Sequence, residues 1–126
     1  MVDRTDKFLN SIAQTIFDKN GANIFALDMR GVTDLADFII IAEGNVDRHV
    51  KAIAKNVIEA AERLGEKPFI VEGEKNGDWI VIDFIGVIVH LFIPEVRQRY
   101  ALERLWCDGK IVDLEITLPM RRSEDE

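Results

Sequence analysis

Apolar side chains recur along this chain with two different periods, and each period predicts a type of element. Over residues 5–19 and 46–64 they return every three or four positions, which predicts two amphipathic helices. Strand-sized apolar runs occur over 24–29, 37–42 and 68–73. The run over 37–42 is too continuously apolar to have a solvated side, so we expect that strand to be covered on both faces.

Turn residues mark where the other elements begin and end. Asn45 is the expected N-cap of the second helix, and Pro94 suits the first position of a third helix that ends near Trp106. Ile85 and Gly86 divide one long apolar stretch into two β-rich runs. Their spacing predicts a hairpin or a bulged turn between two strands.

The end of the chain follows a different pattern. Apolar and polar residues alternate over 112–118, which predicts a half-buried strand, and a charged tail follows over 121–126. The order of elements predicts a single α/β domain over residues 1–108, with a mixed β-sheet flanked by helices. Residues 109–126 then form a C-terminal extension with an extra strand and a disordered acidic end.

Composition narrows the class of protein and its surroundings. With 126 residues and 48% hydrophobic content, the chain can bury one core. Its formal charge of -7 repels phosphate, so we expect little direct contact with nucleic acid. The single cysteine, Cys107, cannot form an internal disulfide, and neither a signal-peptide core nor a membrane-length apolar run is present. We therefore expect a cytoplasmic protein without membrane contact.

Several reaction classes lack their motifs. The only serines are Ser11 and Ser123, and no Gly-x-Ser-x-Gly elbow occurs. Cys107 remains a poorly supported nucleophile. The two histidines, His49 and His90, do not form a His-x-x-x-His pattern, and the glycines match neither the phosphate loop nor the dinucleotide fingerprint. We expect structural roles for both histidines, and neither a metal nor a cofactor.

Three aspartates support an alternative. Asp28, Asp37 and Asp83 lie at or near predicted strand ends, where divalent-metal phosphoryl-transfer sites place their ligands. A nucleotide- or metal-dependent transferase is the resulting hypothesis. None of the three belongs to an Asp-x-Asp pair, so roles in turns or on an acidic face are favoured.

Large amphipathic side chains indicate a surface for a partner. Trp79, Tyr100 and Trp106 lie on elements that also carry charged residues, as aromatic anchors at protein interfaces do. Tyr100 and Trp106 suit the core equally well. Trp79 follows a polar turn at the start of a strand, and we expect it to be exposed.

An ordered set of short stretches resembles the ribosomal silencing factor family, also called the RsfS or Iojap family. The resemblance covers about residues 5–108. The matching stretches are Ala26-Leu27-Asp28, Asp37-Phe38-Ile39-Ile40, Arg48-His49-Val50-Lys51-Ala52-Ile53-Ala54, Glu72-Gly73, Asp78-Trp79-Ile80-Val81-Ile82-Asp83, Val87-Ile88-Val89-His90 and Tyr100-Ala101-Leu102-Glu103-Arg104-Leu105-Trp106. The chain departs from the family at Ile85 and Gly86, where Gly-Asp is typical, and at Ala36 and Val46.

The resemblance implies a non-enzymatic factor that docks on the large ribosomal subunit through ribosomal protein L-fourteen (uL-fourteen). There it would block joining of the small subunit and repress translation during starvation or stationary phase. The family fold is similar to that of nucleotidyltransferases, but the chain lacks their Gly-Ser and Asp-x-Asp motifs. An alternative for the free protein is a homodimer. The expected docking residues are Glu72, Asp78, Trp79, Asp83, His90, Tyr100, Leu102, Glu103, Leu105 and Trp106.

Overall fold

The computed structural model describes residues 4–100 and 109–117. Within these residues the chain forms three helices and six strands. The elements, in chain order, are α1 (Arg4–Asp18), β1 (Ala22–Asp28), β2 (Phe38–Glu43), α2 (Asp47–Arg63), β3 (Ile70–Glu72), β4 (Trp79–Asp83), β5 (Val87–Phe92), α3 (Pro94–Tyr100) and β6 (Lys110–Ile111).

The strands form one mixed sheet, as the sequence predicts. Their spatial order is β3-β4-β5-β2-β1-β6. Only β2 and β5 pair in parallel, because α2 and the β3–β4 pair lie between them in the chain. The other four pairings are antiparallel.

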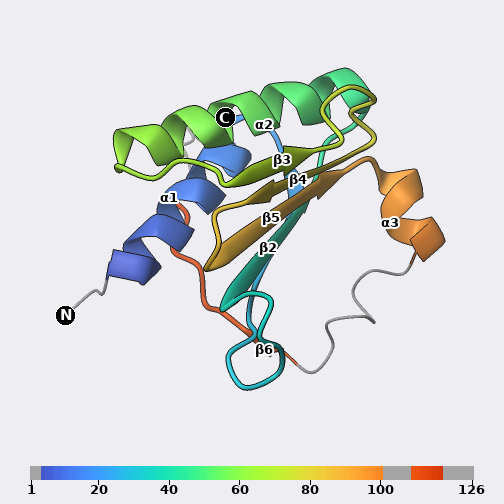
Figure 1. Ribbon diagram of the computed structural model, residues 1–126. Helices are drawn as coiled ribbons and strands as arrows, with labels where there is room; N and C mark the ends of the chain where they lie inside the picture. The colour runs from blue at the N-terminus through green and yellow to red at the C-terminus, as the bar shows by residue number, and fades with distance from the viewer. Residues whose placement is uncertain (1–3, 101–108, 118–126) are drawn as a thin grey trace, which may run out of the picture.

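One face of the sheet is covered by α1 and α2, which lie together on it (Figure 1). The apolar stripe of α1 and that of α2 meet alternate strand residues such as Ile40, Ile82 and Leu91, all of which are buried. Gly65 ends α2 at φ 83, and its N–H bonds to the carbonyl of Glu62. The predicted helices and their inward stripes are thus confirmed.

The opposite face, here called the second face, carries a smaller apolar cluster. Leu27, Ile39, Ile41 and Phe92 belong to it, together with Val96 of α3. Because β2 contributes to both clusters, five of its six residues are buried. The expectation that this strand has no solvated side is confirmed.

The β4–β5 connection is a tight hairpin at Ile85 and Gly86, as predicted. The N–H of Phe84 bonds to the carbonyl of Val87 at 2.8 Å, and the N–H of Gly86 bonds back to the carbonyl of Phe84 at 3.1 Å. Ile85 adopts φ 79, a left-handed conformation that is costly for a β-branched residue. Its N–H is satisfied by Oδ1 of Asp83 at 2.7 Å.

The predicted N-cap of α2 is wrong. Val46 occupies the N-cap position with extended backbone, and no side chain caps the helix there. Asn45 instead donates its backbone N–H to Nδ1 of His49, whose Nε2 lies 2.7 Å from the carbonyl oxygen of Lys19. His49 therefore links the start of α2 to the end of α1, which is a structural role.

The predicted strand over 112–118 is also wrong in position. The strand is β6, which pairs with the edge of β1, and the N–H of Val112 still bonds to the carbonyl of Ala26 in β1 at 2.8 Å. Residues 113–117 have no strand neighbour. Side chains of α1 take the place of that neighbour, because Asn10 accepts the N–H of Glu115, and Gln14 bonds both the N–H and the carbonyl of Thr117. Burial still alternates over 112–117.

Three further predictions concern residues outside the described ranges. They are the continuation of the third helix to Trp106, the disordered acidic end, and the division of the chain at residue 108. Tyr100 is the last described residue of α3. No helix in the described part of the chain is long and apolar enough to cross a membrane.

Candidate partner-binding site

The β4–β5 pair brings two predicted docking residues into contact on the second face. Val81 lies opposite His90, and Trp79 lies opposite Phe92. Residues opposite each other on antiparallel strands share a face, so the indole of Trp79 reaches diagonally to the imidazole of His90. Its Nε1–H donates to Nδ1 of His90 at 3.1 Å.

His90 is held in one neutral form. Burial lowers its pKa from 6.5 to about 4, because the apolar surroundings disfavour the imidazolium. The lone pair on Nδ1 accepts the indole proton, so the ring proton sits on Nε2. The predicted structural role of His90 is thereby supported.

The predicted exposure of Trp79 is wrong in degree, since the side chain is half-buried. Its indole meets the ring of Phe92 edge-on, with centroids 6.4 Å apart, and the ring of His90 at a tilt, 6.1 Å apart. Such contacts favour one orientation of a large ring. Trp79 is therefore a fixed side chain that still presents part of its surface.

Acidic residues surround this aromatic pair. Glu72, an exposed residue of β3, lies opposite Val81 of β4, which in turn lies opposite His90. Glu72 and His90 therefore lie on the same face of the sheet. Asp78 is exposed immediately before β4, and its backbone carbonyl accepts the N–H of Ile93 at 3.0 Å. Asp83, at the end of β4, is half-buried and caps the hairpin turn.

The other predicted docking residues are Tyr100 of α3 and four residues that come after it in the sequence. Tyr100 ends this helix, whereas Leu102, Glu103, Leu105 and Trp106 lie outside the described residues. The structure therefore brings together the predicted residues of β3, β4 and β5, and the contribution of 101–108 stays a prediction.

An ion pair beside this site was missed by the sequence reasoning. Nη1 of Arg97, on α3, lies 2.9 Å from Oε2 of Glu43, at the end of β2. The guanidinium also donates to the carbonyl of Asn23 at 3.0 Å and lies over the rings of Phe25 and Phe92. The only signal for this ion pair in the sequence is an acidic residue, Glu43, directly after an apolar run. No sequence pattern identifies Arg97 as its partner.

The carboxylates of two of the three strand-end aspartates, Asp28 and Asp83, hold local structure. Arg30 donates hydrogen bonds to both carboxylate oxygens of Asp28 and lowers its pKa from 3.8 to about 2. Asp83 caps the hairpin, and the backbone of Asp37 pairs with Met29 and Gly86. Among the described residues, no three His, Cys, Asp or Glu side chains converge as a metal site would require. Within the described residues, the transferase hypothesis therefore lacks the group of converging acids that would hold its metal ion.

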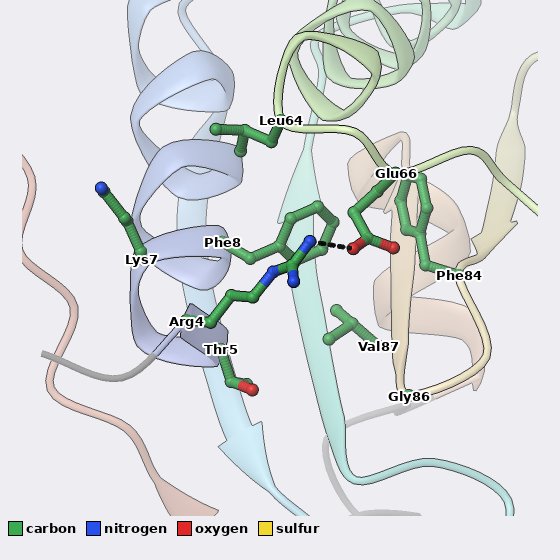
Figure 2. Close-up of a pocket in the computed structure, with 9 residues that line it drawn as sticks. All are labelled: Arg4, Thr5, Lys7, Phe8, Leu64, Glu66, Phe84, Gly86 and Val87. Atoms are coloured by element: carbon green, nitrogen blue, oxygen red, sulfur yellow. Dashed lines mark ion pairs between the residues drawn. The ribbon is translucent and has the colours of Figure 1, made fainter.

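A pocket of about 410 Å³ lies on the helix-covered side of the sheet, between the start of α1 and the β4–β5 turn (Figure 2). Its floor is apolar, with Phe8, Phe84 and Val87, and Arg4 reaches across its mouth to Glu66 at 3.6 Å. No predicted docking residue within the described part of the chain lines it. The pocket is therefore separate from the aromatic pair on the second face.

The fold, with the aromatic pair on its second face, defines a small single-domain α/β protein with a mixed six-stranded sheet. Comparison with known sequences gives its family. The sequence model of RsfS, described as ribosomal silencing factor during starvation, matches residues 2–126. The chain belongs to the ribosomal silencing factor family, which confirms the resemblance seen in its short motifs.

Individual relatives agree with this assignment. The ribosomal silencing factor RsfS of Bacillus subtilis is 38% identical over 98 residues, which are 78% of this chain and 83% of the relative. That of Haemophilus influenzae is 36% identical over 95 residues, 75% of this chain and 93% of the relative. A mouse protein named mitochondrial assembly of ribosomal large subunit protein 1 is 26% identical over 101 residues, 78% of this chain and 44% of that protein.

Solved structures show the same fold. A crystal structure from Bacillus halodurans has a TM-score of 0.76 at 32% identity and covers 86% of this chain and 98% of that one. Another from Chromobacterium violaceum has a TM-score of 0.79 at 28% identity and covers 92% of this chain and 95% of that one.

Proposed function

We propose that this protein silences ribosomes by binding the large subunit through ribosomal protein L-fourteen, in the cytoplasm. Bound there, it blocks joining of the small subunit and represses translation during starvation or stationary phase. The observation that carries the proposal is the fixed aromatic pair of Trp79 and His90, rimmed by acidic residues, in a chain that belongs to this family.

Charge favours this partner over bare RNA. The chain has a formal charge of -7, and Glu72 and Asp78 are exposed beside the aromatic pair. Ribosomal proteins are typically basic because they pack against RNA, so an acidic face speeds their encounter with this one and disfavours phosphate.

Short-range affinity comes from the aromatic side chains. Trp79 is already held by its hydrogen bond to His90 and by the ring of Phe92, so binding has little freedom of that side chain to remove. Large, preordered aromatic anchors are the commonest strong contributors at protein interfaces. Silencing by this route needs bulk at the subunit interface and no catalytic step.

A matched pair of charge reversals tests which face binds. Glu72→Lys changes an exposed acid beside the aromatic pair, and Glu59→Lys makes the same change on α2, on the helix-covered side. We expect Glu72→Lys to reduce the fraction that pellets with isolated large subunits, most strongly at low salt, whereas Glu59→Lys pellets like the unchanged protein. Equal pelleting of the two variants would show that the second face is not the docking surface.

A further inference from the structure

Two hollows adjoin where the start of α1 meets the end of α2. One is the pocket of about 410 Å³ described above, and the other, of about 440 Å³, lies between the two helices and Glu115 of the C-terminal segment. Lys7 and Leu64 line both, so the hollows meet at these two residues. The two hollows, joined at Lys7 and Leu64, are here called the helix-end groove.

The part of the groove between α1 and the β4–β5 turn has a preformed apolar floor. The rings of Phe8 and Phe84 meet edge-on, with centroids 5.3 Å apart, and Val87 completes the lining (Figure 2). All three residues belong to the buried core, so the floor needs no rearrangement before a ligand binds. Its volume of about 410 Å³ is within the range of small-molecule sites, and aromatic rings pack well on such a surface.

Charged side chains line the rest of the groove, and cations outnumber acids among them. The cations are Arg4, Lys7 and Arg63, and the acids are Glu66 and Glu115. The chain as a whole has a formal charge of -7, so this local excess of positive charge is opposite in sign to the average. The groove therefore favours an anion, whereas the rest of the surface repels one.

Two of these cations are available to a ligand. Lys7 and Arg63 are exposed, and neither forms an ion pair with another described residue. Lys7 extends away from Phe8 in Figure 2, so its charge does not lie over the apolar floor. Arg4 differs from them, because it pairs with Glu66 at 3.6 Å, with side chains that are 83% and 42% exposed. An ion pair as exposed as this contributes little and does not close the pocket.

The C-terminal segment forms one wall of the groove and is held in register with α1. Asn10 and Gln14 are four residues apart on this helix, which is about 6 Å along its axis. Their side chains accept the N–H groups of Glu115 and Thr117 at 2.8 and 2.6 Å. Those two residues are about 7 Å apart in an extended chain. Because the two spacings agree, this wall is in place before a ligand binds.

We propose that the helix-end groove binds a small anion that carries an aromatic ring, such as an aryl phosphate or an aryl carboxylate. The ring lies on the floor formed by Phe8, Phe84 and Val87, and the acidic group lies at Lys7 and Arg63. Apolar contact supplies most of the affinity, because two exposed cations attract an anion only weakly through water. The charges select which aromatic molecules bind. The groove is separate from the aromatic pair of the second face, so this inference does not depend on the proposed function.

Calorimetric titration with naphthyl phosphate at low salt tests the groove. We expect one saturable site, with naphthol and inorganic phosphate each bound roughly tenfold more weakly, because each lacks one half of the ligand. Naphthoate in place of naphthyl phosphate distinguishes a carboxylate from a phosphate, and saturable binding of either one supports the inference. If neither binds saturably, or if naphthol binds as tightly as they do, the inference is overturned.

Matched charge reversals locate the acidic group of the ligand. Lys7→Glu and Arg63→Glu change exposed residues of the groove, and Lys55→Glu makes the same change at an exposed position of α2 outside it. Each groove variant should bind naphthyl phosphate roughly tenfold more weakly, whereas Lys55→Glu should bind it like the unchanged protein. Equal affinity in all three variants would contradict binding at Lys7 and Arg63.

NMR spectra of the unchanged protein locate the aromatic ring without any variant. Addition of naphthyl phosphate should shift the backbone amide signals of Phe8, Phe84 and Val87, because a bound ring lies against them. The amide signals of Trp79 and His90, on the second face, should stay constant. Shifts centred on the second face would contradict the proposed site.

Discussion

Lowering the pH should destabilise this protein through His90. The pKa of this imidazole is about 4 in the fold and about 6.5 in the unfolded chain. Between these values the unfolded chain takes up a proton that the folded chain excludes, so stability is complete above pH 6.5 and falls as the pH drops towards 4. The two pKa values give a loss of about 2 kcal/mol in the free energy of unfolding between pH 7 and pH 5.

The matched variant is His90→Gln, whose side-chain oxygen can still accept the Nε1–H of Trp79 but cannot take up a proton in this range. Urea unfolding of both proteins at pH 7 and pH 5 isolates His90, because the two proteins differ at this residue alone. Asp28, with a pKa of about 2, changes charge below this window. The loss in the unchanged protein should exceed that in the variant by about 2 kcal/mol. Parallel profiles would refute a buried, neutral His90.

Backbone strain and close approach give two more predictions, each checked by the urea midpoint. Ile85→Gly should stabilise the fold by about 1 kcal/mol, because glycine adopts φ 79 without strain. The control, Ile85→Ala, should not stabilise the fold, because alanine keeps a Cβ. A loss of stability in the glycine variant would contradict this reasoning. Gly73→Ala should cost more than about 2 kcal/mol, since its Cβ would lie 1.9 Å from the carbonyl oxygen of Trp79. The control is Gly31→Ala, at a similar φ of 83, where an added Cβ would have nothing within 4 Å. It should cost only about 1 kcal/mol. Equal losses of stability at the two glycines would rule out the steric explanation.

The elements that sequence predicted well are those with a strong local pattern. The helical stripes of α1 and α2 and the apolar run of β2 each follow from spacing within a few turns of chain. The hairpin at Ile85 and Gly86 follows from two β-rich runs with a short gap, and its register places His90 beside Trp79. Local periodicity thus determined most of the fold and part of the site.

The features that were missed depend on residues far apart in the chain. Glu43 and Arg97 are separated by 54 positions, and only the folded sheet brings α3 to the end of β2. Alternation over 112–117 correctly indicated an extended, half-buried chain, but not that Gln14 of α1 would take the hydrogen bonds of a neighbouring strand. Trp79 was expected to be exposed because its local sequence is polar, and its packing on Phe92 comes from the opposite strand.

The measurement that tests the central claim most directly is a subunit-joining assay. Isolated large and small ribosomal subunits are mixed with increasing amounts of the protein and separated on a sucrose gradient. The proposed function predicts that the protein migrates with the large subunit and that the peak of joined ribosomes falls as it is added. If the joined peak stays constant while the protein remains at the top of the gradient, the proposal of silencing by subunit blocking is contradicted.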